Sequence, residues 1–180
     1  MAGTTGLLRV AEFARLPRPP GGIRQELHHG ELVEMAPVKK RHTKTQMRLV
    51  QLLGATVRMG TFGVDREFPF RPLAEHEVWV ADVAVFPLDE WERTSDDDYY
   101  QGVPAIVIEV LSPSNTASEM LDREQMCLGN GGQEFWLVDA ERQTVKVTRA
   151  DGHSHMYRVG GDIASDSLGV PIAVDAIFAP

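Results

Sequence analysis

Apolar side chains repeat at helical spacing in two stretches of the chain. Between residues 39 and 59, apolar positions recur every three or four residues: Met47, Val50, Leu53 and Val57. This spacing predicts an amphipathic helix that ends near Gly60. A second helix is predicted over residues 116–128, with Ser114 or Asn115 as its N-cap and the glycines at 129–132 as its end.

Continuous or alternating apolar runs predict strands around these helices. They cover residues 63–71, 78–86, 105–111 and 134–139, and two hairpins follow from the alternation in 25–37 and 144–160. An acidic loop is predicted at 91–104, and a strand with an extended tail at 167–180. The order predicts an α/β or α+β fold, in which a mixed β-sheet is flanked by helices and carries extra β-hairpins at both ends.

Length and composition indicate one globular domain. The 180 residues are 43% hydrophobic and 24% charged, so we expect an N-terminal arm at 1–22, with a short helix in 10–17, and a single domain at 23–180. No apolar run reaches the roughly 18 residues that cross a bilayer, so we expect no membrane partner. The single Cys127 excludes an internal disulfide, which fits a cytoplasmic protein.

The net charge of -8 argues against a protein that coats nucleic acid nonspecifically. Residues 39–48, however, contain five basic side chains and no acidic one. Lys40, Lys44 and Arg48 form a stripe along the first predicted helix, which makes this segment the expected phosphate contact. A solvated helix face is the alternative.

Two acidic residues lie in strands that are otherwise apolar. Asp82 is the only polar residue of 78–86, where it shares a face with Ala84 and Phe86, and Glu109 is the only one in 105–111. An unpaired buried carboxylate costs several kcal/mol, so each requires a salt bridge, hydrogen bonds or a metal ion. Carboxylates on neighbouring strands can hold one Mg²⁺, which lowers the pKa of a bound water. A single acid could instead form a structural salt bridge or reach water at a strand end.

The two helices each carry a further candidate. Arg123 lies one turn after Glu119 on the second helix, and the alternative there is an exposed ion pair of little energetic weight. His42 and Gln46 begin an inward stripe on the first helix that continues through Leu49 and Leu53. A core histidine with no ligand is the alternative for His42.

Several motifs together resemble the Uma-type family of proposed bacterial restriction endonucleases, a branch of the PD-(D/E)xK nuclease superfamily. They are HHGELVEMAP, the helix with His42, VADVAVF, GVPAIVIEVLSPSNTASEMLDRE and NGGQEFWLVD. The resemblance runs from about Ile23 to the C-terminus and is most specific at EVLSPS and EFWLVD. It implies a three-layer, restriction-endonuclease-like core with a magnesium-dependent phosphodiesterase site on its strands.

The resemblance places the superfamily's two motif acids on Asp82 and Glu109. The superfamily's lysine position is Leu111 here, but this branch often carries the lysine on the following helix, where Arg123 stands. The usual proline before the first acid is Ala81. An arginine stays charged and can stabilise a phosphorane, yet it does not readily accept a proton.

The resemblance implies a role for two further residues. The family's ELxxGEL glutamate matches Glu31, and its helix histidine matches His42. Both would stand behind the metal ligands or assist a second ion. The expected site therefore has Mg²⁺ (or Mn²⁺) on Asp82, Glu109 and the Val110 carbonyl.

The expected partner is nucleic acid, DNA before RNA, hydrolysed at its phosphodiester bonds. A homodimer is left open. Two other functions are possible. The first is a noncatalytic domain that binds nucleic acid or protein, in which Arg123 only neutralises Asp82 and Glu109. The second is a purely structural domain, which the net charge of -8 favours.

Overall fold

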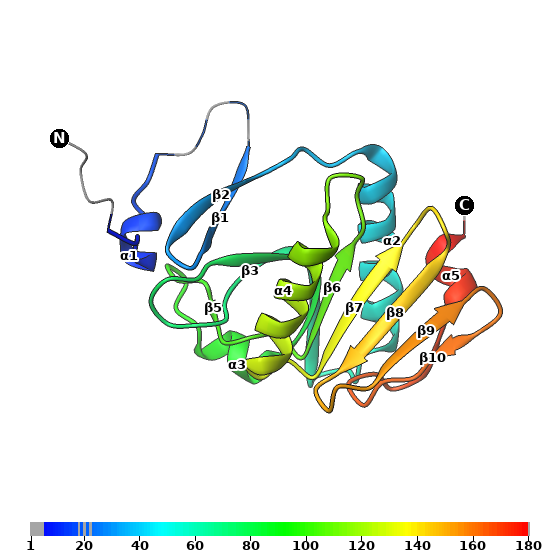
Figure 1. Cartoon of the computed structure of the whole chain (residues 1–180). Helices are drawn as coiled ribbons and strands as arrows, with labels where there is room; N and C mark the ends of the chain where they lie inside the picture. Colours follow the sequence, from blue (N-terminus) through cyan, green and yellow to red (C-terminus); the bar gives the residue numbers. More distant parts are fainter. Residues whose placement is uncertain (1–5, 18, 20, 22, 180) are drawn as a thin grey trace.

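A seven-stranded mixed sheet forms the centre of the computed structural model, which describes residues 6–17, 19, 21 and 23–179 (Figure 1). The strand order is β5-β3-β4-β6-β7-β8-β9. The strands are β3 Phe62–Arg71, β4 Trp79–Pro87, β5 Tyr100–Gln101, β6 Ile106–Val110, β7 Glu134–Asp139, β8 Thr144–Arg149 and β9 Ser154–Arg158. The pairs β3–β5 and β6–β7 are parallel and the other pairs are antiparallel. The prediction of a mixed sheet is confirmed.

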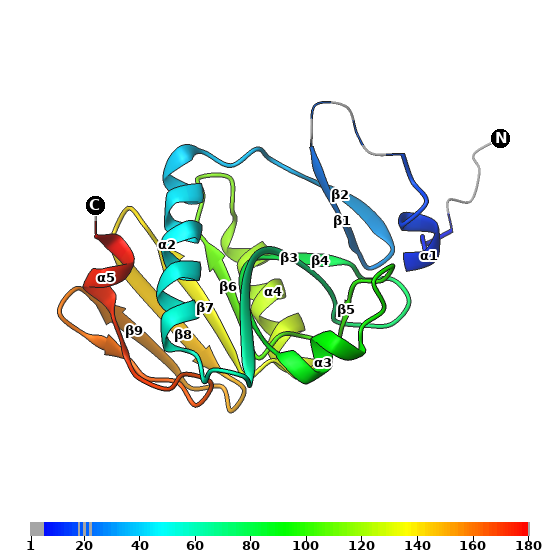
Figure 2. The ribbon, with the colours of Figure 1, turned by 180° about the vertical axis from the view of Figure 1, so that it is seen from behind.

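Helices cover both faces of this sheet. Helix α2 (Lys40–Thr56) and the short α5 (Val174–Phe178) lie on one face, and α4 (Ala117–Gly129) lies on the other (Figure 2). Leu49 and Leu53 of α2 are fully buried against the valines and isoleucines of β4 and β6. Cys127 of α4 packs among the aromatic side chains of the opposite face. The inward stripe predicted for α2 is therefore confirmed. In the described part of the chain, no helix is both long and apolar enough to cross a membrane.

An N-terminal hairpin attaches to one end of the sheet. Strands β1 (Arg24–His28) and β2 (Glu31–Met35) turn at His29 and Gly30, which both have positive φ angles. Leu27 exchanges two backbone hydrogen bonds of 2.9 Å with Val78, just before β4. Val10, in helix α1 (Val10–Phe13), packs on Leu27 and Val78. These contacts fix the hairpin beside β4.

Two local predictions are wrong, and a third is right only in part. Thr116, not Ser114 or Asn115, caps α4, because its hydroxyl accepts from the N–H of Glu119 while the Glu119 carboxylate accepts from the N–H of Thr116. The C-terminal tail is not extended. After the small pair β10 (Asp162–Ile163) and β11 (Ile172–Ala173) it forms α5, whose Val174 and Ile177 are buried three residues apart.

The acidic loop is also partly regular. Helix α3 (Leu88–Arg93) begins after Pro87 with two acidic residues in its first turn, where they favour the helix dipole. Strand β5 follows at Tyr100 and joins the sheet edge. The acidic composition suggested a loop, but the acidic residues at 89 and 90 instead stabilise the first turn of a helix.

Candidate active site

Strands β4 and β6 diverge at the two buried carboxylates. Their ladder runs from Val85 opposite Ile106 to Val83 opposite Ile108 and then stops. Beyond it, the Asp82 carboxylate accepts the N–H of Val110 at 2.8 Å, which fills the gap between the strands. Asp82 is 3% exposed and Glu109 is 7% exposed. The predicted pair of buried acids on neighbouring strands is confirmed.

The alternation of β4 breaks at Asp82. Ala81 and Ala84 belong to the same apolar cluster, although a regular strand would place them on opposite faces. On the neighbouring strand β3, Arg66 pairs with Val83 and Phe68 pairs with Ala81. Glu67, between them, lies opposite Asp82 and has a φ of 50°. This distortion turns Asp82 toward α2, where Gln46 donates to it from Nε2 at 2.9 Å.

His42 adds a second contact from α2. Its Nε2 lies 3.0 Å from Oδ1 of Asp82, but the two atoms are not aligned as a hydrogen bond. Both ring nitrogens of His42 are buried without a hydrogen-bond partner among the described residues. A buried polar atom without a partner is costly, so this position favours an additional ligand, water or ion.

Arg123 holds the opposite side of the cluster. It reaches in from α4, is 4% exposed, and donates to Oε1 of Glu109 at 2.9 Å. Its second terminal nitrogen donates to Glu26, and its guanidinium lies 5.1 Å from the centroid of the Trp79 ring. The alternative of an exposed pair with Glu119 is wrong, because Glu119 closes the capping box of α4.

Glu26 is the functional candidate that sequence reasoning missed. It is fully buried on β1, accepts from Nε2 of His28 at 2.7 Å, and lies 3.4 Å from a nitrogen of Arg24. The structure does not bring Glu31 to the cluster, since that side chain is exposed beside the hairpin turn. The sequence did contain a signal for Glu26. The ELxxGEL pattern that includes Glu31 begins at Glu26, and Glu26 and His28 are two ionisable residues on one face of the same strand.

A further chain of contacts joins the hairpin to α2. Arg24 pairs with Glu67, and Gln46 donates to the other Glu67 oxygen at 2.6 Å as well as to Asp82. Gln46 therefore orients Asp82 while being held itself.

Negative charge exceeds positive charge inside this cluster. Glu26, Asp82 and Glu109 are buried around one buried guanidinium, that of Arg123. Burial raises the pKa of Glu109 to about 8; Arg123 opposes this shift, whereas Asp82 adds to it. Burial also acts to raise the pKa of Glu26, but Arg123, His28 and Arg24 hold that pKa below its usual value.

The donor set suits a hard divalent cation. Among the described residues, no group of three or more His, Cys, Asp or Glu side chains is arranged to hold a metal ion by itself. Magnesium, however, commonly uses one or two carboxylates and keeps several waters. The oxygen donors, the excess negative charge and the unpartnered nitrogens of His42 fit such an ion at Asp82 and Glu109.

A pH dependence follows from Glu109. Above about pH 4.5 the unfolded chain releases this proton, while the folded protein retains it to about pH 8. The free energy of unfolding of the metal-free protein should therefore fall as pH rises through that window. Urea unfolding at several pH values measures the slope. Glu109→Gln should flatten it, and an unchanged slope would contradict the raised pKa.

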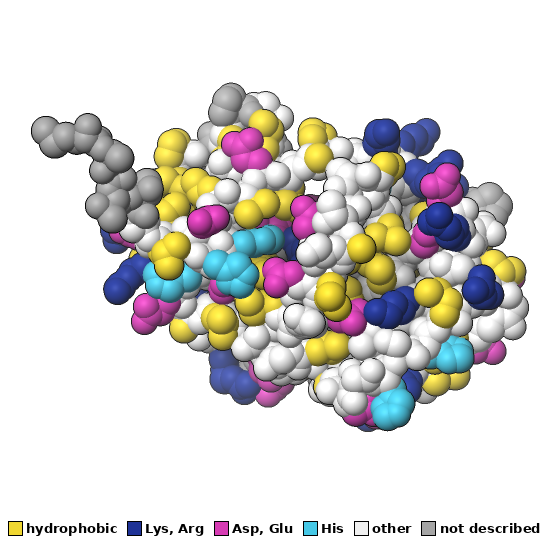
Figure 3. Space-filling view, in the orientation of Figure 1, with side chains coloured by type: hydrophobic (Ala, Val, Ile, Leu, Met, Phe, Trp, Pro, Cys, Tyr) yellow, Lys and Arg dark blue, Asp and Glu magenta, His cyan; other side chains and the backbone are white. Residues whose placement is uncertain are grey.

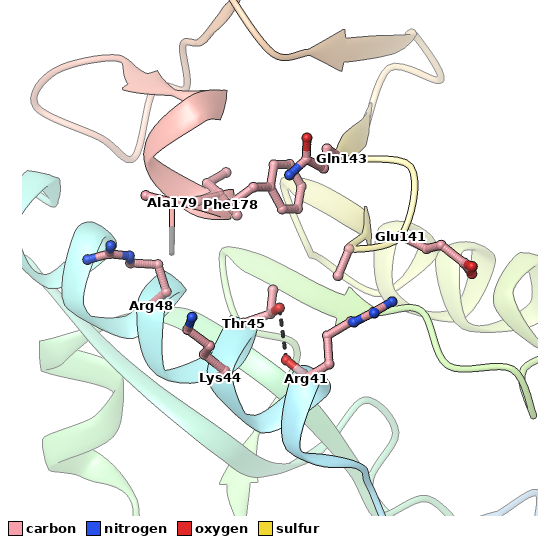
Figure 4. A pocket seen from close by; sticks show the side chains of 10 residues that line it. Arg41, Lys44, Thr45, Arg48, Glu141, Gln143, Phe178 and Ala179 are labelled. Atoms are coloured by element: carbon pink, nitrogen blue, oxygen red, sulfur yellow. Dashed lines mark hydrogen bonds between the residues drawn. The ribbon is translucent and has the colours of Figure 1, made fainter.

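The predicted basic stripe divides in the structure. Lys44 and Arg48 line a cavity together with Arg41 (Figure 4). Lys40 is exposed and does not line it. Figure 3 shows lysine and arginine side chains gathered at the upper right, over the end of the molecule where α2 begins and α5 ends.

A mixed sheet with helices on both faces, whose neighbouring strands diverge at two buried acids, is the arrangement of a nuclease-like α/β domain. The chain belongs to the Uma2 family, described as "Putative restriction endonuclease", which it matches over residues 10–176. This confirms the resemblance seen in the sequence and extends it toward the N-terminus from about Ile23.

The structure is similar to the crystal structure of "a putative nuclease belonging to DUF820" from Anabaena variabilis. The TM-score is 0.80 at 20% sequence identity, and the match covers 96% of this chain and 98% of that one. The likeness establishes the fold. Comparison with curated proteins gave no match.

Proposed function

We propose that the protein is a metal-dependent endonuclease that hydrolyses phosphodiester bonds of nucleic acid, DNA before RNA. One observation carries the proposal: Asp82 and Glu109 stand buried where β4 and β6 diverge, in a cluster with more carboxylates than cations. Such a cluster is costly unless a cation or proton balances it. Membership of the Uma2 family supports the same chemistry.

Asp82 and Glu109 would hold Mg²⁺ or Mn²⁺, with the Val110 carbonyl as a further donor. A bound ion would lower the pKa of a water and stabilise charge that develops on phosphorus. The N–H of Val110 and the amide of Gln46 fix both oxygens of Asp82 in position. His42 stands beside the same carboxylate and can orient a water there.

Arg123 stands at the position where the resemblance places the family's lysine. Because its guanidinium stays charged, it positions Glu109 and stabilises negative charge but does not act as a base. Glu26 accepts a hydrogen bond from the other terminal nitrogen of that guanidinium. Of the residues named, Glu31 is the one whose position gives the least support to a role, since it is exposed.

The ion pair between Arg123 and Glu109 also favours a second function. If Arg123 permanently neutralises Glu109, the domain would bind nucleic acid without cleaving it. The two functions differ in whether a divalent ion can share Glu109 with Arg123.

Cleavage assays separate them. The parent protein should degrade labelled DNA in Mn²⁺, and RNA and single-stranded substrates tested in parallel would define the preference. Arg123→Lys should keep or raise the cleavage rate, since it restores the family's residue while retaining the charge. A parent and an Arg123→Lys variant that are both inactive on every substrate would support the noncatalytic function.

A further inference from the structure

A cavity of about 410 Å³ lies between the first turns of α2, the β7–β8 turn and the end of α5. Its volume lies in the range of roughly 300–1,000 Å³ that is usual for small-ligand sites. Arg41, Lys44 and Arg48 line one wall, and Phe178 and Gln143 line the other (Figure 4). The walls therefore differ in chemistry, one cationic and one formed by a ring and an amide.

The cationic wall has no anionic partner among the described residues. Arg41 and Lys44 are exposed and form no ion pair there, and Arg48 only approaches Gln51, at 3.5 Å. Glu141 also lines the cavity, but its side chain points away from the other labelled residues in Figure 4. Arg41 lies in the first turn of α2, where the helix dipole disfavours a cation. No acidic residue in that turn offsets this interaction. A bound phosphate would pair with these cations and offset the unfavourable interaction of Arg41 with the helix dipole.

The opposite wall suits a nucleobase. The Phe178 ring is half-buried and lines the cavity together with Gln143 (Figure 4). Gln143 closes the turn between β7 and β8 with a φ of 53°. Proteins recognise unpaired bases by stacking them on aromatic rings and by hydrogen bonds to their edges.

The cavity is next to the candidate active site along α2. Arg41 and Thr45 line the cavity, whereas the residues that follow them, His42 and Gln46, contact Asp82. Consecutive helical residues point about 100° apart, so the two sites occupy adjacent faces of the same two turns. A strand that crosses this end of α2 can reach both.

We propose that this cavity binds one nucleotide of an unpaired nucleic-acid strand, next to the phosphodiester bond that is cleaved. Its phosphate contacts the cations of α2, and its base lies on Phe178 within reach of the Gln143 amide. The inference rests on the proposed nucleic-acid substrate and adds the strandedness of the segment bound beside the metal site.

Fluorescence anisotropy of a labelled oligonucleotide in Ca²⁺, as single strand and as duplex, tests the proposal. Phe178→Leu keeps an apolar side chain against the core but removes the ring. It should weaken single-strand binding about tenfold, within the range for losing one stacked base, and change duplex binding less than twofold. Arg41→Gln combined with Lys44→Gln should weaken binding to both and flatten its salt dependence.

The matched control is Arg66→Gln combined with Arg158→Gln, which removes the same charge from two exposed positions outside the cavity. It should change single-strand affinity less than the cavity double variant does. Melting temperatures close to that of the parent establish that each variant is folded. Single-strand affinity within twofold of the parent in the Phe178 variant, or an equal loss on duplex, would overturn the proposal. So would a free nucleoside monophosphate that binds as tightly as the oligonucleotide.

Hydrolysis of bis(p-nitrophenyl) phosphate in Mn²⁺ separates this proposal from the proposed function. That substrate has no flanking nucleotide, so Phe178→Leu should keep the parent's rate on it. If the parent hydrolyses it and the cavity variants bind single strands like the parent, the cavity proposal fails alone. If the parent hydrolyses neither substrate while the expected binding losses appear, the endonuclease proposal fails and the nucleotide cavity stands.

Discussion

Arg123→Ala is expected to lower the free energy of unfolding of the metal-free protein by about 3–5 kcal/mol, the cost of removing one partner from a buried ion pair. The truncation leaves Glu26 and Glu109 buried without the guanidinium that both contact. It also removes the contact between that guanidinium and Trp79. Urea unfolding at pH 7 measures the change.

Arg142→Ala is the matched control. Arg142 pairs with Asp139 at 2.9 Å but is exposed, so its removal should change stability little. Added Mg²⁺ should restore part of the loss in Arg123→Ala, since a cation can replace the missing charge. A loss within 1 kcal/mol of the control would show that Arg123 does not hold the cluster together.

Asp82→Asn and Glu109→Gln are each expected to abolish Mn²⁺ binding and to reduce cleavage at least about a thousandfold, because several kcal/mol of transition-state stabilisation depend on the ion. Glu109→Gln should leave stability the same or raise it, since it removes one of the crowded carboxylates. Asp82→Asn should lower stability moderately, because it replaces one of two oxygens that accept buried hydrogen bonds. Calorimetric titration with Mn²⁺ and thermal unfolding measure the two effects on the same sample.

Asp65→Asn provides the control for these variants. Asp65 lies on β3 but is exposed, so its change removes the same charge outside the cluster. It should bind Mn²⁺ as the parent does. Parent-like Mn²⁺ binding by Asp82→Asn or by Glu109→Gln would mean that the ion is held elsewhere.

The elements that set up the site were predictable because their patterns are local. Helix α2 followed from apolar spacing, and the two strands from apolar runs that a single acid interrupts. Asp82 and Glu109 stood out for the same reason, since a carboxylate in an apolar strand is costly wherever the strand packs. The position of Arg123 came from a resemblance, because helical spacing alone also allowed an exposed pair.

Other parts depend on contacts between distant segments. Glu26 reaches Arg123 only because Leu27 pairs with Val78 and docks the hairpin beside β4. Strand alternation placed Asp82 on a face with Ala84, but the break in β4 turns it toward Gln46. Neither the docking nor the break has a signature in the local sequence.

The most direct test of the metal-dependent site is the cleavage rate of a labelled oligonucleotide as a function of Mn²⁺ concentration. The rate should rise from zero and reach half its maximum at the Mn²⁺ dissociation constant that calorimetry gives for the same protein. Asp82→Asn should show neither the heat of binding nor cleavage. Cleavage that persists in Asp82→Asn, or that does not change with Mn²⁺, would contradict a divalent ion held by Asp82 and Glu109.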